Sequence, residues 1–333
     1  MKKRIHNSVT SIIIMVLMIV FLGALVLNFY YKSNTEQKRY NMVLIPKAID
    51  SSNAFWSSVM EGGKLGAKEY NINLQIMGVY YEQDVEGQIE QIEKAIEQKP
   101  DAIAIAPADS KRTAPALKEA KEKGIKIILI DSLLVDETIA DCVITTNNIK
   151  AGKELGEYAK KLVEEDDEIV MVGHVKGTST AIQREEGMRK GLGEYEKNIK
   201  EVIFSGSSYE QAFADTMKAI DENPNLKLIM GMNEYSAVGA ARAVEATGNA
   251  GKIKMVGFDN SLEEIQMLER GVFDAIIIQK PVNMGYLSIE KGVKILNRES
   301  YNKNYDSGST LINRGNMYLD ENQRLLYPFT GKQ

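Results

Sequence analysis

Short apolar runs rich in Ile and Val recur along the chain from residue 42 to residue 279, and this alternation constrains the fold more than any other feature. The runs are MVLI (42–45), LQIMGV (74–79), AIAIAP (102–107), IKIILID (125–131), CVITT (142–146), EIVMVG (168–173), EVIF (201–204), KLIMGM (227–232), IKMVGFD (253–259) and AIIIQ (275–279). A strand that is apolar along nearly its whole length is buried on both faces, as in a parallel sheet covered by helices.

The stretches between these runs have the periodicity of helices. In segment 85–97 the apolar residues Val85, Ile89, Ile92 and Ile96 are three or four positions apart, which places them on one helix face. Similar patterns occur in segments 151–163, 237–246 and 282–297. Strands that alternate with helices in this way predict βαβ units with right-handed crossovers.

So many strands divide more naturally between two doubly wound, parallel-sheet lobes than within one open sheet. We therefore predict an α/β protein whose first lobe comprises residues 40–146 and 280–310, and whose second lobe comprises residues 147–279 and 311–333. The polar, turn-rich segment 298–310 suits a crossing from one lobe to the other.

An uninterrupted apolar stretch, SIIIMVLMIVFLGALVLNFYY at 11–31, precedes the alternating pattern. No charged residue occurs between Arg4 and Lys32, and a helix of about 20 apolar residues spans the hydrocarbon core of a bilayer. A cleaved signal peptide fits the basic start, but the run exceeds the roughly 7–15 residues of its apolar region and no A-x-A site follows. We predict a transmembrane anchor at 11–31, a cytoplasmic N-terminus at 1–10, a linker at 32–39 and an extracellular remainder.

Composition argues against several functions. Lys and Arg total 41 against 46 Asp and Glu, for a net charge of −5, and no basic block follows the N-terminus, so no nucleic-acid partner is expected. The single cysteine, Cys142, excludes an internal disulfide, and its apolar surroundings predict a buried, unreactive thiol. His6 and His174 are the only histidines and no Cys/His cluster has metal-ligand spacing, so neither a metal nor a cofactor is expected.

Polar and aromatic side chains follow several apolar runs, and in open α/β sheets ligands bind beyond the carboxyl ends of the strands. These residues are Asn53, Phe55, Trp56, Asp131, Arg184, Asn233, Asp259 and Gln279. Carboxylates accept hydrogen bonds from sugar hydroxyls, a guanidinium donates to them, amides do both, and an aromatic ring packs on the C–H face of a sugar. The combination predicts a sugar site. Taken singly, Asn53, Asn233 and Asp259 are equally well interpreted as helix caps or turn formers. Phe55 and Trp56 alone are better interpreted as core or helix-staple residues, and Arg184 alone as a charge on a helix surface.

Six segments that hold these residues resemble sugar-binding periplasmic proteins of the type I, ribose-binding class. In chain order they are NAFW (53–56), LIDS (129–132), GTSTAIQREEG (177–187), MNEYSAVGAARA (232–243), VGFDNS (256–261) and IIIQKPVNMGY (276–286). The resemblance implies two lobes that are joined by three crossings and close on the ligand. It also implies that the eight residues named above bind the ligand.

One departure from the family pattern bears on the choice of sugar. Asp131 is followed by Ser132, where ribose binders have an arginine. Lys47, in LIPKAID, is a candidate replacement cation, since some relatives with a Pro-Lys start pair it with a tryptophan; it is equally well interpreted as a solvated lysine. The case for ribose itself is weakened, and a pentose such as D-xylose or ribose is favoured over a hexose or polyol.

The apolar stretch at 11–31 favours one role for such a receptor, because a helix anchor without a lipid-attachment cysteine resembles the xylose-sensing binding proteins that work with a histidine kinase. We predict a single-pass extracellular receptor that signals to a membrane histidine kinase; the alternative is the substrate-binding component of an ABC sugar transporter. An enzyme is not expected, because no G-x-S-x-G, P-loop or H-E-x-x-H occurs. A sugar-responsive repressor, which shares the two-lobe core, would carry a helix-turn-helix where this chain has the apolar stretch.

Overall fold

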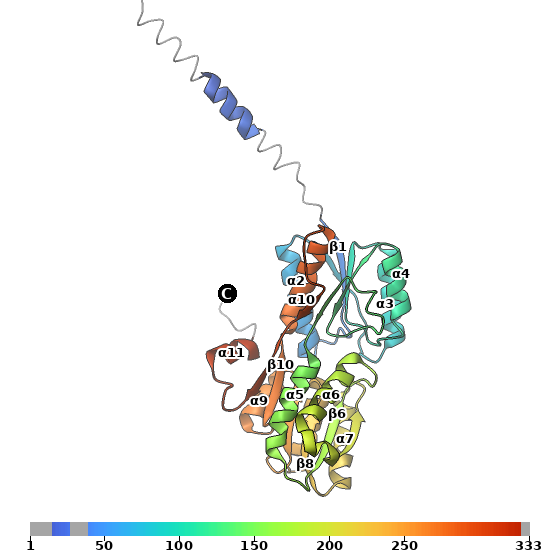
Figure 1. Ribbon diagram of the computed structural model, residues 1–333, viewed down its shortest axis with the longest axis vertical. Coiled ribbons are helices and arrows are strands. Elements are labelled where there is room, and N and C mark those ends of the chain that lie inside the picture. The colour runs from blue at the N-terminus through green and yellow to red at the C-terminus, as the bar shows by residue number, and fades with distance from the viewer. Residues whose placement is uncertain (1–14, 27–38, 328–333) are drawn as a thin grey trace, which may run out of the picture. The chain divides into compact units, whose positions relative to one another are not determined.

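The computed structural model describes residues 15–26 and 39–327 of the chain. The chain divides into two compact units, Met1–Tyr40 and Asn41–Gln333. The second unit is an α/β structure of two lobes, each with one sheet between layers of helices (Figure 1).

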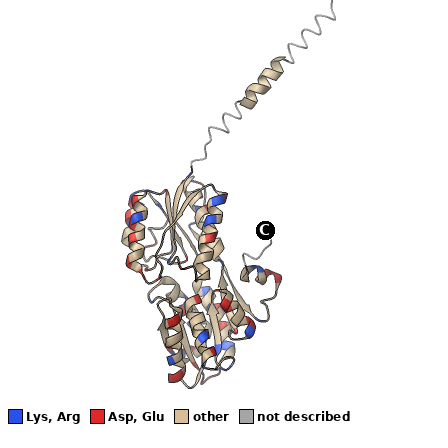
Figure 2. Cartoon of the chain, turned by 180° about the vertical axis from the view of Figure 1, so that it is seen from behind, with Lys and Arg blue, Asp and Glu red and all other residues tan. Residues whose placement is uncertain are grey.

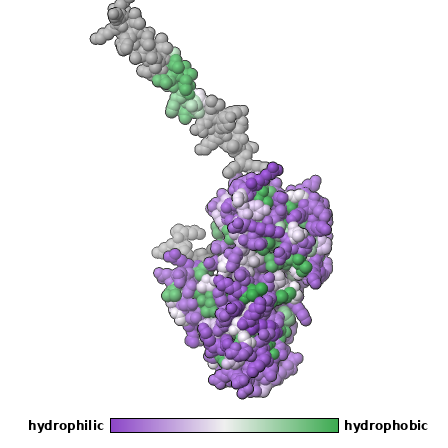
Figure 3. Space-filling view, viewed as in Figure 1, coloured by the Kyte–Doolittle hydropathy of each residue, from purple (hydrophilic) through white to green (hydrophobic). Residues whose placement is uncertain are grey.

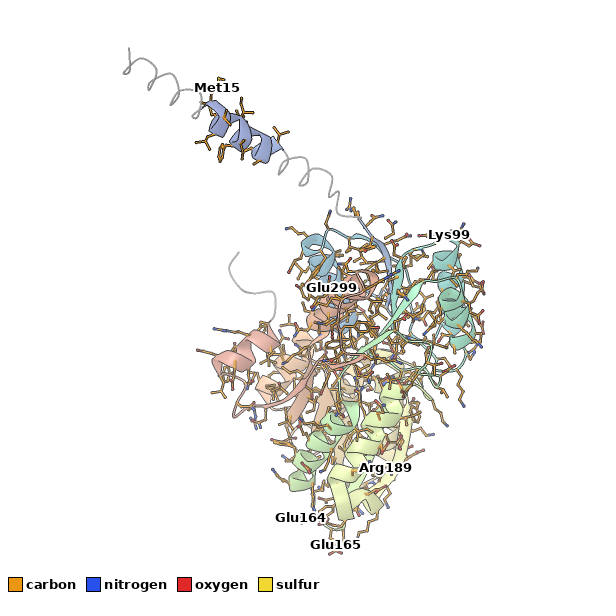
Figure 4. All side chains as sticks on the ribbon, turned by 45° about the horizontal axis from the view of Figure 1, so that its top comes forward. Met15, Lys99, Glu164, Glu165, Arg189 and Glu299 are labelled. Atoms are coloured by element: carbon orange, nitrogen blue, oxygen red, sulfur yellow. The ribbon has the colours of Figure 1, made fainter. Side chains whose placement is uncertain are left out.

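Within the first unit, residues 15–26 form a helix whose large apolar side chains, Met15 among them, are exposed (Figures 3 and 4). No helix in the described part of the chain has both the length and the apolar character needed to span a bilayer. The anchor predicted at 11–31 extends at both ends outside the described residues, as do the predicted N-terminus at 1–10 and nearly all of the linker at 32–39.

Each lobe is built on a six-stranded sheet. In spatial order the first sheet is β11 (Asn304–Asp306), β5 (Cys142–Thr145), β4 (Lys126–Ile130), β3 (Ala102–Ile105), β1 (Asn41–Ile45) and β2 (Asn73–Ile76). The second is β12 (Ser309–Asn313), β10 (Ala275–Gln279), β9 (Lys254–Phe258), β8 (Leu226–Gly231), β6 (Glu168–Gly173) and β7 (Ile199–Phe204). All neighbouring strands are parallel except β12, which is antiparallel to β10. Every predicted apolar run overlaps a strand, and the predicted two-lobed α/β fold is confirmed.

Helices cover both faces of each sheet (Figure 1). In the first lobe these are α2 (Ala54–Glu69) and α10 (Pro281–Leu296) on one face, and α3 (Val85–Glu97) and α4 (Ala114–Glu122) on the other. In the second lobe they are α5 (Asn148–Ala159) and α6 (Ser179–Leu192) on one face, and α7 (Tyr209–Glu222), α8 (Glu234–Ala246), α9 (Leu262–Arg270) and the short α11 (Asp320–Leu326) on the other. Basic and acidic residues are interspersed on the outer helix faces seen in Figure 2, which agrees with the balanced charge of the sequence.

Two helices begin a turn before the segments that periodicity predicted. Helix α5 starts at Asn148 and α8 at Glu234, ahead of the predicted starts at 151 and 237. Asn147 and Asn233 cap them by accepting a backbone hydrogen bond in the first turn. Apolar periodicity marks only the buried face, so it does not register a polar first turn that a cap stabilises.

The apolar cores lie against both faces of the sheets, and the central strands are fully buried. Cys142 lies at the start of β5 and is buried, which raises the pKa of its thiol to about 11. A thiol with that pKa stays protonated near neutral pH, as expected for the buried, unreactive cysteine predicted from the sequence.

The chain crosses between the lobes in three places: between β5 and α5, between β10 and α10, and between β11 and β12. Each crossing contributes one member of a buried hydrogen-bonded group. Thr146 Oγ1 donates to Gln279 Oε1 at 2.9 Å and lies 3.1 Å from Ser307 Oγ. The polar segment 298–310 contains the short edge strand β11, which apolar patterning does not reveal.

Helices α2 and α10 approach so closely that glycine is required where they touch. A Cβ atom on Gly285 would lie 1.9 Å from the carbonyl oxygen of Val59. We expect Gly285→Ala to lower the free energy of unfolding by about 1–3 kcal/mol, because the helices must separate to admit the methyl group. Chemical denaturation measures the change. Lys64→Ala, at an exposed position on α2, is the control, and equal stability of the two variants would contradict the close contact.

Candidate functional site

The carboxyl ends of the parallel strands in both sheets face one cavity between the lobes. The opposite ends point away from it: Lys99 lies at the outer end of the first lobe, and Glu164 and Glu165 at that of the second (Figure 4). About 290 Å³ of space free of protein atoms lies between the cavity walls, and part of it is open to solvent. Its lining consists of Lys47, Asn53, Phe55, Trp56, Glu82, Asp131, His174, Thr180, Arg184, Asn233, Asp259 and Gln279. Every residue predicted to bind ligand is in this set.

The first residues of α2 form an aromatic wall of the cavity. Asn53 caps the helix by accepting a hydrogen bond from the backbone N–H of Trp56 at 2.9 Å, so α2 begins at the cavity edge. The rings of Phe55 and Trp56 meet edge to face with centroids 4.9 Å apart. Trp56 Nε1 donates to Glu82, which fixes the orientation of the indole. Asn53 therefore fits both of its interpretations, because it caps a helix and lines the cavity.

Lys47 and Asp131, which follow β1 and β4, form a buried ion pair. Lys47 Nζ lies 2.9 Å from Asp131 Oδ2 and 5.8 Å from the centre of the Trp56 ring. Only 2% of Lys47 is exposed, so its interpretation as a solvated lysine is wrong. Burial alone would raise the pKa of Asp131, but the charges of Lys47 and Arg184 lower it below its ordinary value. The pair presents a carboxylate and an ammonium group together at the cavity wall.

Arg184 projects from α6, and two hydrogen bonds and one stacking contact fix its guanidinium group. Its Nε donates to Asn148 Oδ1 at 2.8 Å and its Nη1 donates to the carbonyl of Met232 at 2.6 Å. The guanidinium carbon lies 4.4 Å from the centre of the Phe258 ring, which is a stacking distance. Arg184 is 2% exposed, so its interpretation as a surface charge is wrong. Among the described residues Nη2 has no hydrogen-bond partner, which leaves it available to a ligand.

Asp259, Gln279 and Asn233 complete the second-lobe side. Asp259 Oδ1 accepts from Gln279 Nε2 at 2.6 Å, and Oδ2 accepts from the backbone N–H of Glu234 at 2.9 Å. Burial raises the pKa of Asp259 although Arg184 and Gln279 favour its charged form. Asn233 caps α8 through Ser236, so it too serves as cap and lining residue.

Both site aspartates have left-handed backbone conformations. The φ angle is +58° at Asp131 and +86° at Asp259. Asp adopts this region more readily than most residues, and such conformations gather at functional sites. In each case the turn immediately follows a strand and presents the carboxyl group to the cavity.

Three lining residues, Glu82, His174 and Thr180, were not predicted. Glu82 lies beyond the 74–79 run and His174 directly follows the 168–173 run, so the strand-end rule applied evenly would have found both. The pKa of His174 is held well below its ordinary value by burial and by the positive charges of Lys47 and Arg184. The imidazole is therefore neutral. Its Nε2 lies 3.3 Å from Thr180 Oγ1, so the ring takes part in the site through hydrogen bonding and not through charge. No arrangement of described His, Cys, Asp and Glu side chains is suited to hold a metal ion.

The profile of the family described as "Periplasmic binding protein domain" matches residues 43–300. The chain belongs to this family. Within the family it is similar to the ribose- and allose-binding proteins of type I, which confirms the ribose-binding class predicted from the sequence motifs. Members of the family bind sugars and are not enzymes. This periplasmic binding protein is 29% identical over 262 residues to a D-ribose/D-allose-binding protein of Pseudomonas aeruginosa, an alignment that covers 77% of this chain and 82% of the relative.

Solved structures agree with that assignment. A sugar transporter from Clostridium phytofermentans is 41% identical with a TM-score of 0.79, and the match covers 83% of this chain and 100% of that one. An ABC transporter solute-binding protein from Agrobacterium vitis, crystallised with bound D-fucose, is 26% identical with a TM-score of 0.81 and coverages of 86% and 100%.

Proposed function

We propose that this periplasmic binding protein is the monosaccharide-binding component of an ABC importer and that it closes on its sugar between the two lobes. The observation that carries the proposal is the composition of one small cavity. Its wall combines an aromatic pair, two aspartates, a guanidinium, an ammonium and three carboxamides, contributed by both lobes.

The cavity groups that lack protein partners match the needs of a sugar. Among the described residues, Asp131 Oδ1, Arg184 Nη2 and the amide nitrogens of Asn53 and Asn233 have no protein hydrogen-bond partner. A sugar hydroxyl both donates and accepts, so it pairs with acceptors such as Asp131 and with donors such as Arg184. Phe55 and Trp56 supply apolar surface for the C–H face of the ring. A polyhydroxylated ligand can thus supply hydrogen-bond partners for all of these groups.

The ligand that we favour is a pentose such as D-xylose or D-ribose. The cavity offers at most about 290 Å³ of space, open solvent included, which favours a single sugar ring over a disaccharide. The relatives named above support the class of ligand, since one is named for D-ribose and D-allose and another holds D-fucose. Lys47 pairs with Asp131, whereas ribose binders have an arginine directly after this aspartate, and this difference is our reason to include D-xylose beside D-ribose.

Two of the relatives are named as transport proteins, which supports a permease as the partner over the histidine kinase that the N-terminal segment suggested. We further propose that the protein works outside the cytoplasm, at the outer face of the cell membrane, anchored by the apolar stretch at 11–31.

Affinity purification from detergent-solubilised membranes tests whether the partner is a permease or a histidine kinase. Co-purification of ABC permease subunits is the expected result, and recovery of a histidine kinase without a permease would favour the signalling role.

Trp56 provides the test of sugar binding, because it is the only tryptophan in the sequence and it lines the cavity. We expect titration of the full-length protein with D-xylose, D-ribose, D-allose and D-fucose to change its fluorescence saturably for at least one pentose. The same sugar should raise the melting temperature, since a ligand at 100 times its Kd stabilises the folded state by about 2.7 kcal/mol. Maltose is the control. A panel of monosaccharides that changes neither signal would contradict the proposed function.

A further inference from the structure

Glu234 is the first residue of α8, and its carboxylate contacts the start of α2 in the opposite lobe. Its oxygens accept hydrogen bonds from the backbone N–H of Ala54, at 3.1 and 3.2 Å, and from that of Phe55, at 3.3 Å. Asn53 accepts the next N–H of α2, that of Trp56. The first-turn N–H groups of a helix have no partner within the helix and attract negative charge. The second lobe therefore completes the cap that Asn53 begins.

The same residue is joined to the ligand side of the cavity. The backbone N–H of Glu234 donates to Asp259 Oδ2 at 2.9 Å, and Tyr209 OH donates to Glu234 Oε1 at 2.7 Å. Glu234 is only 1% exposed. One residue thus connects a cavity carboxylate in the second lobe to the helix that carries Phe55 and Trp56 in the first.

We propose that Glu234 is a closure latch: a positioning residue that caps α2 from the opposite lobe in the closed form and thereby makes sugar affinity depend on pH. The inference rests on the proposed sugar-binding function. Movement of the lobes apart must break the bonds to Ala54 and Phe55 and return the carboxylate to water, because α2 and α8 belong to different lobes. Glu234 is not among the residues that line the cavity, so it acts by holding the aromatic wall in place.

Other hydrogen bonds also cross between the lobes, and they provide comparisons. Tyr235 OH donates to Asp50 Oδ2 at 3.1 Å, and the N–H of Leu133 donates to Ser179 Oγ at 2.8 Å. Ser207 Oγ donates to Glu82. Of these, the Tyr235 bond is the closest match to the latch, since it involves the next residue of α8 but can be removed without altering a charge.

The surroundings of Glu234 give the latch its pH dependence. The ionisable groups around it are Asp259, which follows β9, Glu264 of α9, Tyr209 of α7 with the Arg242 guanidinium over its ring, and Tyr235 with its partner Asp50. Burial, with Asp259 as a further cause, raises the pKa of Glu234 to about 7, although Tyr209 and the α2 N–H groups favour the charged form. Burial, together with the charges of Glu234 and Asp259, also raises the pKa of Glu264 well above its ordinary value.

Proton linkage determines whether sugar affinity rises or falls with pH. In an open form with the carboxylate in water its pKa is near the ordinary 4.5, and closure raises it to about 7. Closure therefore takes up a proton between these values and becomes more favourable as the pH falls below 7. Since the sugar binds the closed form, its affinity should be about tenfold higher at pH 6 than at pH 8.

Calorimetric titration of the full-length protein with D-xylose and D-ribose between pH 6 and pH 8 tests the latch. Glu234→Gln keeps an oxygen that accepts from α2 but cannot ionise, so its affinity should vary less than threefold over this range and match that of the wild type at pH 6. Glu234→Ala should bind at least tenfold more weakly at pH 6. Tyr235→Phe should weaken sugar binding by a factor that does not change with pH. Glu97→Gln, at an exposed position, should leave the affinity and its pH dependence unchanged. A wild-type pH profile that persists in Glu234→Gln would overturn the proposal.

A second measurement separates failure of the latch from failure of the proposed function. Small-angle X-ray scattering without sugar should show the wild type more compact at pH 6 than at pH 8, and Glu234→Gln equally compact at both. If neither pentose nor any other monosaccharide binds the wild type, the proposed function fails, and the scattering result alone decides the latch. If sugar binds and neither affinity nor compactness depends on Glu234, the latch fails and the sugar-binding function stands.

Discussion

Replacement of Asp259 by alanine is expected to weaken sugar binding by about 2–5 kcal/mol, a factor of roughly thirty to several thousand. Asp259 accepts hydrogen bonds from Gln279 and from the Glu234 backbone, and it lies in the field of Arg184. Its loss leaves a buried guanidinium less compensated and a buried backbone N–H without its acceptor. Both costs fall on the closed form, in which these groups are shut away from water.

Calorimetry on purified Asp259→Ala, with whichever monosaccharide gives the largest response in the Trp56 titration, measures this loss. Asp166→Ala is the matched control, because Asp166 is exposed and distant from the crossings. Asp259→Asn keeps the shape and one acceptor oxygen, so it should fall between the wild type and Asp259→Ala. Wild-type affinity in Asp259→Ala would remove this residue from the site.

Replacement of Lys47 by methionine is the second change for which we expect a large effect. Methionine keeps the length of the side chain but leaves the Asp131 carboxylate without its partner at 2.9 Å in a buried position. Removal of one member of a buried ion pair costs about 3–5 kcal/mol, because an uncompensated charge remains. We expect a loss of this size in the free energy of unfolding at neutral pH, measured by urea denaturation, together with weaker sugar binding.

The double variant Lys47→Met/Asp131→Asn distinguishes the charge from the packing. It has no uncompensated charge, so it should regain part of the stability that Lys47→Met loses. The pH dependence provides a further check. The pKa of Asp131 is lowered in the folded protein, so its stabilising contribution is present above the ordinary value of 3.8 and is lost as the pH falls through the folded pKa. That loss at low pH should be seen in the wild type and not in Lys47→Met.

The sequence predicts the cavity well because a parallel sheet has a simple geometry. When the apolar runs form parallel strands, the residues that directly follow them lie at one edge of the sheet, whatever conformation the loops adopt. Asp131 and Asp259 fit this rule most closely, since each directly follows a strand and turns into the cavity through a left-handed residue. Asn53 and Asn233 each cap a helix and line the cavity, so a capping role does not remove either residue from the proposed site.

Other features depend on geometry that residue patterns do not carry. The strand β11 is polar because it is an edge strand, so no apolar run marks it. Glu234 looks like an ordinary acidic residue in the first turn of a helix, and only the closed arrangement of the lobes reveals its bonds to α2. The burial of Lys47 likewise becomes visible only when β1 and β4 are placed in one sheet.

A crystal structure of the protein with its tightest-binding monosaccharide tests the central claim most directly. We predict one sugar ring in the cavity between the lobes, with a C–H face against Phe55 or Trp56 and hydroxyls bonded to Asp131, Arg184 and Asp259. A sugar bound at any other place, with this cavity empty, would contradict the account.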